Sequence, residues 1–247
     1  MRAVWAVYKR ELALYFRSPI AYGVAFALLL FIGLLFTSNV SAGNGQAPAT
    51  FLNIAPELLS FLTFLVAPLL TMRLLSEEAR EGTLEVLMTL PMRELQFVLG
   101  KFLAVWSYYT LLLAIMLIYP ILLSTVGILD TGQLVGSYLG AWLYGGAMLA
   151  VCLIWSALFE DQIVAAFLGA ASVLVLFLAE SAAIWAANQG ILSGTADFIR
   201  EFSLSAHYQS TLAQGVLRAE DILYFVLLIV AAIFITVRIV EIRRWRA

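Results

Sequence analysis

Few side chains in this sequence have the types and spacing that chemistry requires. A nucleotide-binding phosphate loop needs Gly-x-x-x-x-Gly-Lys-Ser/Thr after a strand, whereas Gly100-Lys101 is followed by Phe102 at the expected start of a helix. The one histidine, His207, and the one cysteine, Cys152, are poor support for a His/Cys metal site. We expect His207 to lie on the surface of a loop and Cys152 to be a buried, inert thiol. No nucleophile motif is present, so we predict neither a catalytic nor a metal site in this chain.

One segment outside the apolar runs, residues 76–93, is dense in charge. Its first half carries Glu77, Glu78, Arg80 and Glu81. Gly82 follows this run and is expected to end a first helical turn, because glycine adopts the left-handed conformation found after many helices. The segment is therefore predicted to bend at its middle and to begin a new helix after the glycine.

That second helix is predicted from Thr83 to Leu90. Thr83 can cap its first turn, where the helix dipole favours the negative charge of Glu85, and Pro91 ends it. One face is apolar and is formed by Leu84, Leu87 and Met88, with Val86 and Leu90 beside them. An exposed apolar face needs a cover. Two covers remain open: a groove in a partner protein, or the lipid and the spans of this chain.

The composition indicates that lipid surrounds most of the chain. Apolar residues make up 63% and charged residues 12%, against about 25% charged in typical soluble domains. Six apolar segments reach the ~20 residues that a helix needs to cross a bilayer. The first is interpreted as a retained span, because its apolar run exceeds the core of about 7–15 residues in a signal peptide. The six are residues 19–37, 56–75, 97–125, 134–159, 162–187 and 222–240, with Pro68 and Pro120 expected to kink two of them.

The basic residues determine the expected orientation. Twelve of the fourteen Lys and Arg residues lie in or beside the N-terminal arm, the loop between the second and third spans, and the C-terminal tail. Only Arg200 and Arg218 fall on the other side of the predicted membrane. Cytoplasmic loops are enriched in Lys and Arg. We therefore predict a multi-pass protein of a cell (bacterial inner) membrane with both termini in the cytoplasm.

Two regions outside the spans are predicted to form short helices. Residues 1–17 place aromatic and apolar side chains on one face and cations on the other, which is typical of a helix in the membrane interface; an ordinary basic flank is the alternative. The long outer loop, residues 188–221, contains helical patterns near 196–202 and 206–216, the second ended by Gly215. We expect these helices to dip back into the membrane.

Two features inside the predicted spans each allow more than one interpretation. Glu180 is an acid within a span, where charges are costly and often functional. It could face a polar cavity, pair with Arg200, or lie at the outer end of a shorter span. Gly136 and Gly140 are four residues apart and allow close helix approach. They fit a contact between two copies of the chain or packing within one.

The charged segment resembles a motif of one known family. Residues 77–85, followed by Pro91 and Gly100-Lys101, are similar to the permease subunits of type-2 ABC exporters, and most of all to the gliding-motility and nitrous-oxide-reductase-maturation permeases. The start and the end of the chain add to the resemblance, which thus spans nearly the whole sequence. The similar stretches are Lys9-Arg10-Glu11-Leu12, Tyr15-Phe16, Ser18-Pro19-Ile20-Ala21-Tyr22, Gly215-Val216 and Asp221-Ile222-Leu223-Tyr224-Phe225.

This resemblance implies an all-α, polytopic fold with six transmembrane helices, formed by residues 1–247 as a single transmembrane domain. Residues 1–17 would be the interfacial connecting helix, 76–93 the loop with the cytoplasmic coupling helix, and 188–221 the extracytoplasmic loop with re-entrant helices. The surface that docks on an ATPase would consist of Glu77, Glu78, Arg80, Glu81, Gly82, Thr83, Leu84, Glu85, Leu87, Met88, Leu90 and Pro91.

The resemblance also implies partners and cofactors. The chain would be a non-enzymatic permease that couples ATP hydrolysis in two separate ABC ATPase subunits to export. ATP and Mg²⁺ would be bound by those subunits, with no cofactor in this chain. A second permease copy or a related permease is expected, with an accessory protein carrying an extracytoplasmic domain as a further candidate and no nucleic-acid partner. The competing interpretations are a membrane-embedded enzyme and a scaffold or channel component that works without ATP.

Overall fold

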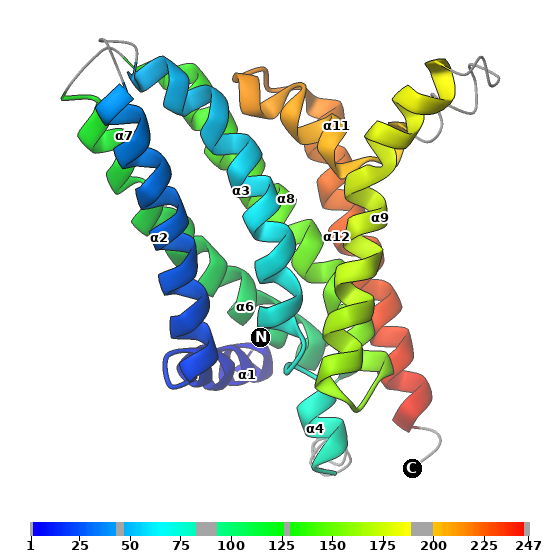
Figure 1. The fold of residues 1–247 in the computed structure, drawn as a ribbon. Helices are drawn as coiled ribbons and strands as arrows, with labels where there is room; N and C mark the ends of the chain where they lie inside the picture. Colours follow the sequence, from blue (N-terminus) through cyan, green and yellow to red (C-terminus); the bar gives the residue numbers. More distant parts are fainter. Residues whose placement is uncertain (1, 43–46, 83–92, 126–128, 189–199, 245–247) are drawn as a thin grey trace.

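The computed structural model describes residues 2–42, 47–82, 93–125, 129–188 and 200–244. These residues contain helices and no strand, and six of the helices are long and apolar enough to cross a membrane (Figure 1). The predicted all-α fold with six spans is therefore confirmed. The spans are formed by α2 (Pro19–Ala42), α3 (Ala47–Thr71), α6 (Glu94–Met116) with α7 (Ile118–Leu123), α8 (Thr131–Leu158), α9 (Gln162–Asn188) and α12 (Ala219–Arg244). The shorter elements are α1 (Arg2–Tyr15), α4 (Ser76–Arg80), α11 (Leu204–Gln209) and the 3-10 helix η1 (Leu212–Gln214).

The central helix of the bundle is α8. It contacts α3, α6, α9 and α12, and its residues 143–153 are all buried. Gly145 and Gly146 allow this close packing, because the ring of Tyr109 and the indole of Trp106 on α6 occupy the positions that Cβ atoms would take. Small residues bring helix backbones together in membranes, where van der Waals contact replaces the hydrophobic effect between helices. The position of α8 thus follows from its own small residues.

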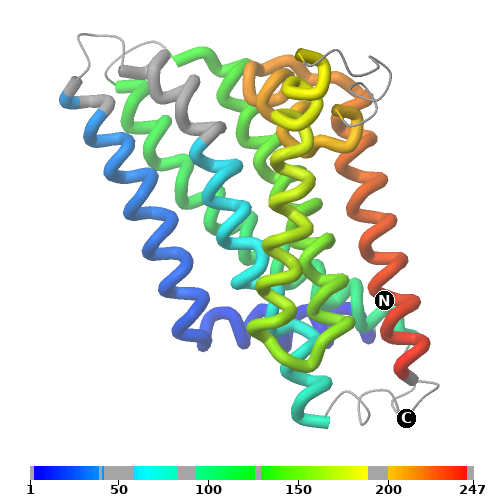
Figure 2. Tube along the Cα trace, turned by 45° about the vertical axis from the view of Figure 1, so that its right-hand side comes forward, coloured from blue at the N-terminus to red at the C-terminus, as the bar shows by residue number. Residues whose placement is uncertain are grey.

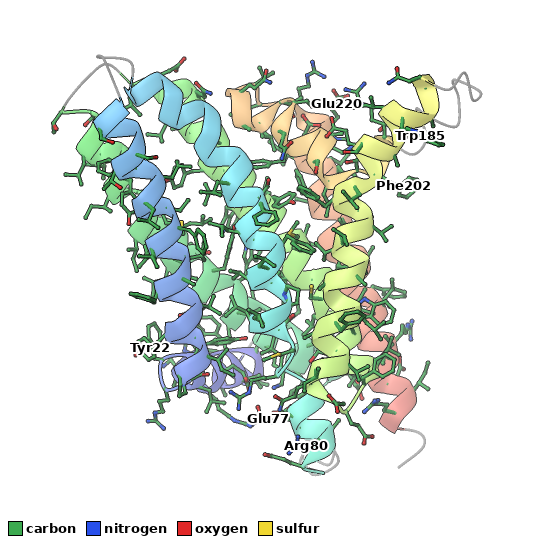
Figure 3. All side chains as sticks on the ribbon, viewed as in Figure 1. Tyr22, Glu77, Arg80, Trp185, Phe202 and Glu220 are labelled. Atoms are coloured by element: carbon green, nitrogen blue, oxygen red, sulfur yellow. The ribbon has the colours of Figure 1, made fainter. Side chains whose placement is uncertain are left out.

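The outer surface of the bundle is apolar between two aromatic ends. Phe26 on α2 is 67% exposed and Phe167 on α9 is 73% exposed, as expected where hydrocarbon replaces water. Tyr22 lies near one end of the bundle, and Trp185 and Phe202 lie near the other (Figure 3). All three side chains are more than half exposed. Because aromatic residues gather at membrane–water interfaces, these residues mark the two interfacial levels.

Pro120 divides the third span into two helices. The helix is interrupted just before this proline, between α6 and α7, which is the predicted kink. Proline has no N–H to bond the carbonyl four residues earlier, here that of Met116. The hydroxyl of Tyr138 on α8 donates to this carbonyl at 3.1 Å, so the neighbouring helix satisfies the freed acceptor. Pro68, by contrast, lies within α3, which continues past it.

The first helix, α1, lies across the ends of the spans. It is found at the end of the bundle that also carries α4 and the C-terminal end of α12 (Figure 2). It packs along α6, with Val7 and Glu11 buried, whereas Trp5 is 57% exposed. The side of α1 that packs on α6 thus buries a carboxylate, whereas the ring of Trp5 is exposed. The carboxylate of Glu11 is buried because it pairs with Lys101 on α6.

Two short helices, α11 and η1, close the opposite end. The helical pattern predicted over residues 206–216 forms both elements, and Gly215 ends the second with φ +84°, a conformation that glycine adopts without strain. They pack on α8 beside Gly136 and Gly140. A Cβ atom at Gly136 would lie 2.7 Å from the Cα of Gly215, and one at Gly140 would lie 2.7 Å from the Cβ of Leu212. Packing within one subunit therefore occupies this face of small residues.

Gly136→Ala is expected to lower the free energy of unfolding by about 1–3 kcal/mol, because the added methyl overlaps backbone atoms that have no rotamer to change. Gly23→Ala is the matched control, since nothing lies within 4 Å of its Cβ position, and alanine there should stabilise α2 by roughly 0.5–1 kcal/mol. Thermal unfolding of both purified variants in detergent measures the difference. Equal unfolding temperatures, together with weaker association between copies of the Gly136 variant, would instead make this face a contact between subunits.

Candidate functional site

The predicted docking segment begins at a bend that we call the elbow, residues 72–82. It leads the chain from the end of α3 into α4. Leu74, Leu75 and Ser76 are buried against the neighbouring helices. Gly82 has a φ of +68° and follows α4, so the predicted end of the first turn is confirmed.

The structure places the predicted docking residues in different surroundings. Glu78 is buried, Glu77 is half-buried, and Arg80 and Glu81 are exposed. Figure 3 shows Glu77 and Arg80 together at the end of the bundle that carries α1. The other residues of the predicted docking surface lie outside the described residues; they are Thr83, Leu84, Glu85, Leu87, Met88, Leu90 and Pro91.

The elbow is held by Lys101, a residue of α6 that is 1% exposed. Its Nζ lies 3.1 Å from Oε1 of Glu11 and 3.0 Å from Oε2 of Glu78, and it donates to the carbonyl of Leu74 at 2.6 Å. The ring of Phe97 lies below it, 5.1 Å from Nζ to the centroid. A buried ammonium is costly unless opposite charges and acceptors surround it. Lys101 has both, and they come from α1 and from the elbow.

Helix α1 makes two further contacts near the elbow. Nη2 of Arg10 donates to Oε1 of Glu78 at 3.2 Å. The hydroxyl of Tyr15 donates to the carbonyl of Leu70, near the end of α3, at 2.6 Å. Burial, with a smaller contribution from the negative charge of Glu11, raises the pKa of Tyr15 well above its ordinary value. We call Arg10, Glu11, Glu78 and Lys101 the ionic cluster.

Helix α8 holds the elbow from another side. Oγ of Ser156 accepts hydrogen bonds from the backbone N–H groups of Leu75 at 3.0 Å and Ser76 at 3.3 Å. The same hydroxyl donates to the carbonyl of Met72 at 3.3 Å. Backbone groups at helix ends lack hydrogen-bond partners within the helix. Here one serine hydroxyl is the partner of three such backbone groups. The elbow is thus fixed to α1, α6 and α8 together.

Three residues of this site, Lys101, Glu11 and Ser156, are not among the predicted docking residues. Lys101 carries a signal in the sequence, because it falls inside the apolar run of the third span, where a charge needs a partner. Glu11 also carries one, since it follows the apolar Val7 by four residues and so shares its side of the helix. Nothing in the sequence singles out Ser156, because its role depends on the path that the elbow takes past α8.

The opposite end has a smaller polar group. His207, which we expect on the surface, is partly exposed: its side chain is 15% exposed, and Nδ1 lies 2.7 Å from Oδ1 of Asp221. Its ring stacks on that of Tyr224 with centroids 4.0 Å apart. Glu180 is half-buried on α9, and among the described residues no ion pair joins it to Arg200. Within the same residues, no group of three His, Cys, Asp or Glu side chains could hold a metal ion.

Lys101→Met is expected to lower the free energy of unfolding by about 3–5 kcal/mol, because two buried carboxylates lose their shared countercharge. Adding Glu11→Gln and Glu78→Gln should recover most of this loss. The matched control is Glu241→Gln, which removes the exposed ion pair with Arg238 on α12 and should change stability by less than about 1 kcal/mol. Denaturation of the purified variants measures all three. A Lys101→Met protein as stable as the control would show that the cluster does not hold the elbow.

Comparison with known protein families identifies the family of this chain. The model of the family described as ABC-2 family transporter protein matches residues 16–178, about two thirds of the chain. A search of curated proteins finds no match. Members of this family are transmembrane subunits without catalytic activity, which excludes a membrane-embedded enzyme, and they work with ABC ATPase subunits. The chain belongs to the ABC-2 transporter family and is a multi-pass membrane permease.

Proposed function

We propose that the elbow is the part of this permease that receives force from the ATPase subunits and passes it to the spanning helices. The observation that carries the proposal is the buried Lys101, which joins the elbow to α6 and α1 through Leu74, Glu78 and Glu11. A segment that is bonded to three helices in this way moves with them. The docking helix at residues 83–90 would rest in a groove of an ATPase, and its displacement would reach the bundle through the elbow.

The contacts of the elbow support three routes for this force. Ser156 leads to α8, the central helix. Lys101 leads to α6, and Arg10 leads to α1, which lies along α6. ATP binding by the partner ATPases would then favour one of two arrangements of the bundle, because a ligand shifts an equilibrium toward the state that it binds more tightly. ATP and Mg²⁺ would be bound entirely by those partners.

The same arrangement supports an orientation of the bundle in the membrane and a set of partner subunits. Helix α1, the elbow and the C-terminal end of α12 share one end of the bundle (Figure 2). The basic clusters of the sequence lie in or near these segments, so this end would face the cytoplasm. Two ATPase subunits would bind there. A second permease, either a copy of this chain or a related one, would complete an exporter of the gliding-motility and nitrous-oxide-reductase-maturation type, which the motif at residues 77–85 resembles.

Leu84→Glu and Leu87→Glu are each expected to abolish the stimulation of the ATPase by the permease, because a carboxylate cannot enter an apolar groove without losing its hydration. The measurement is ATP hydrolysis by the cognate ATPase, co-expressed with the permease and reconstituted in vesicles. Binding of the ATPase to the permease is measured in parallel by co-purification.

Thr89→Glu is the matched control, because position 89 falls on the side of the predicted helix away from Leu84 and Leu87. This variant should keep both binding and stimulation. Full stimulation in both leucine variants would refute docking through the apolar face. A permease that captures no ATPase even in its natural form would refute the force-transfer proposal as a whole.

A further inference from the structure

A cavity of about 470 Å³ opens beside the elbow and has no role in the docking proposal. Its walls are formed by the end of α1, the first turn of α2, the end of α3 and the elbow itself. One part of the lining is charged and the other is apolar. The apolar part includes Leu14, Ile20 and Leu69, which are 48%, 39% and 41% exposed. The cavity therefore combines a polar region with an apolar one at the level where α1 crosses the ends of the spans.

Most charges of the lining neutralise one another. In the ionic cluster, Lys101 and Arg10 balance Glu11 and Glu78. Beside it, Arg73 and Glu77 form an ion pair at 2.9 Å, and Nε of the same arginine donates to the same carboxylate at 3.1 Å. Two lining charges of opposite sign remain.

These two charges are Arg17 and Glu81, both exposed, and the described residues provide neither with an ion pair. Arg17 stands just before the first turn of α2, which also lines the cavity and whose leading N–H groups have no partner within the helix. Glu81 follows α4 on the elbow. The lining therefore provides one place for an anion and one for a cation, next to an apolar surface.

We propose that this cavity binds a phospholipid with a zwitterionic headgroup of the phosphoethanolamine type. The phosphate would be bound by Arg17 and the first turn of α2, and the primary ammonium by Glu81. The acyl chains would run along Leu14, Ile20 and Leu69 into the bilayer. A purely anionic headgroup would leave Glu81 facing negative charge. A soluble zwitterion would leave the apolar part of the cavity uncovered.

Such a lipid has a consequence for the elbow. Arg17 follows α1 and Glu81 lies near the end of the elbow, so one headgroup would connect the two segments that the ionic cluster also joins. The bound lipid would stabilise the arrangement of α1 and the elbow seen here and would make their separation depend on membrane composition. This inference does not depend on the docking helix, because the proposed contacts use only Arg17, Glu81, the first turn of α2 and the apolar lining.

The experiment measures lipid binding to the full, delipidated chain by native mass spectrometry, with no ATPase present. The probes are diacyl phosphatidylethanolamine, diacyl phosphatidylglycerol and the tail-free glycerophosphoethanolamine. The natural chain is expected to prefer phosphatidylethanolamine to phosphatidylglycerol. Arg17→Gln and Glu81→Gln should each weaken its binding about fivefold, the effect of one exposed charge contact. Glu81→Gln should also remove the preference between the two lipids.

The control is Arg238→Gln, which removes an exposed cation near the C-terminal end of α12, away from the cavity. This variant should bind all three probes as the natural chain does. Because Arg17 and Glu81 are exposed, their variants should keep the natural unfolding temperature, which is measured beside the binding. Unchanged binding in both variants, or equal losses in the control, would refute the site. Binding of glycerophosphoethanolamine as tight as that of the diacyl lipid would refute the assignment to a bilayer lipid.

Discussion

The arrangement at the end of the bundle that carries α1 depends on one ammonium group that is closed off from water. Lys101 is 1% exposed and has two carboxylates, a carbonyl and an aromatic face around it. Buried ion pairs contribute little net stability, because their desolvation offsets much of the attraction between the charges. Their effect is on position: a charge that has specific partners cannot slide to a neighbouring site without losing them. The contacts of Lys101 with Glu11, Glu78 and Leu74 therefore place the elbow and α1 at one position along α6.

The same requirement does not apply in the middle of the bundle, where position comes from small residues. Gly145 and Gly146 allow Tyr109 and Trp106 of α6 to reach the backbone of α8, and Gly136 and Gly140 admit η1 and α11 at the other end. Ser156 then joins α8 to the elbow. One helix is thus in contact with the elements at both ends of the molecule. A displacement at the elbow has a continuous packed route along α8 to α11 and η1 at the opposite end of the bundle.

The sequence predicted the spans well, because about twenty apolar residues in a row have few other stable forms in lipid. It also predicted the interruption near Pro120, which follows from a missing N–H, and the left-handed ends at Gly82 and Gly215. Contacts between different helices could not be predicted from local sequence patterns. The burial of Glu11 depends on where Lys101 lies on another helix, and the pairing of His207 with Asp221 depends on how α11 folds back against α12. The apolar helix at residues 83–90 remains a prediction from the sequence.

The ionisable pairs of the described residues, both buried and exposed, lie toward the two ends of the bundle. At one end they join α1, α6 and the elbow, and at the opposite end His207 and Asp221 join α11 to α12. Charges in the hydrocarbon would be costly, so electrostatic pairing is available only near the interfaces. Between the ends, the spanning helices are joined by packing and by hydrogen bonds of neutral groups, such as that between the hydroxyls of Thr63 and Tyr109 at 2.9 Å. A movement that separates α1 from the elbow, or α11 from α12, must therefore break or replace an ion pair at that end of the bundle.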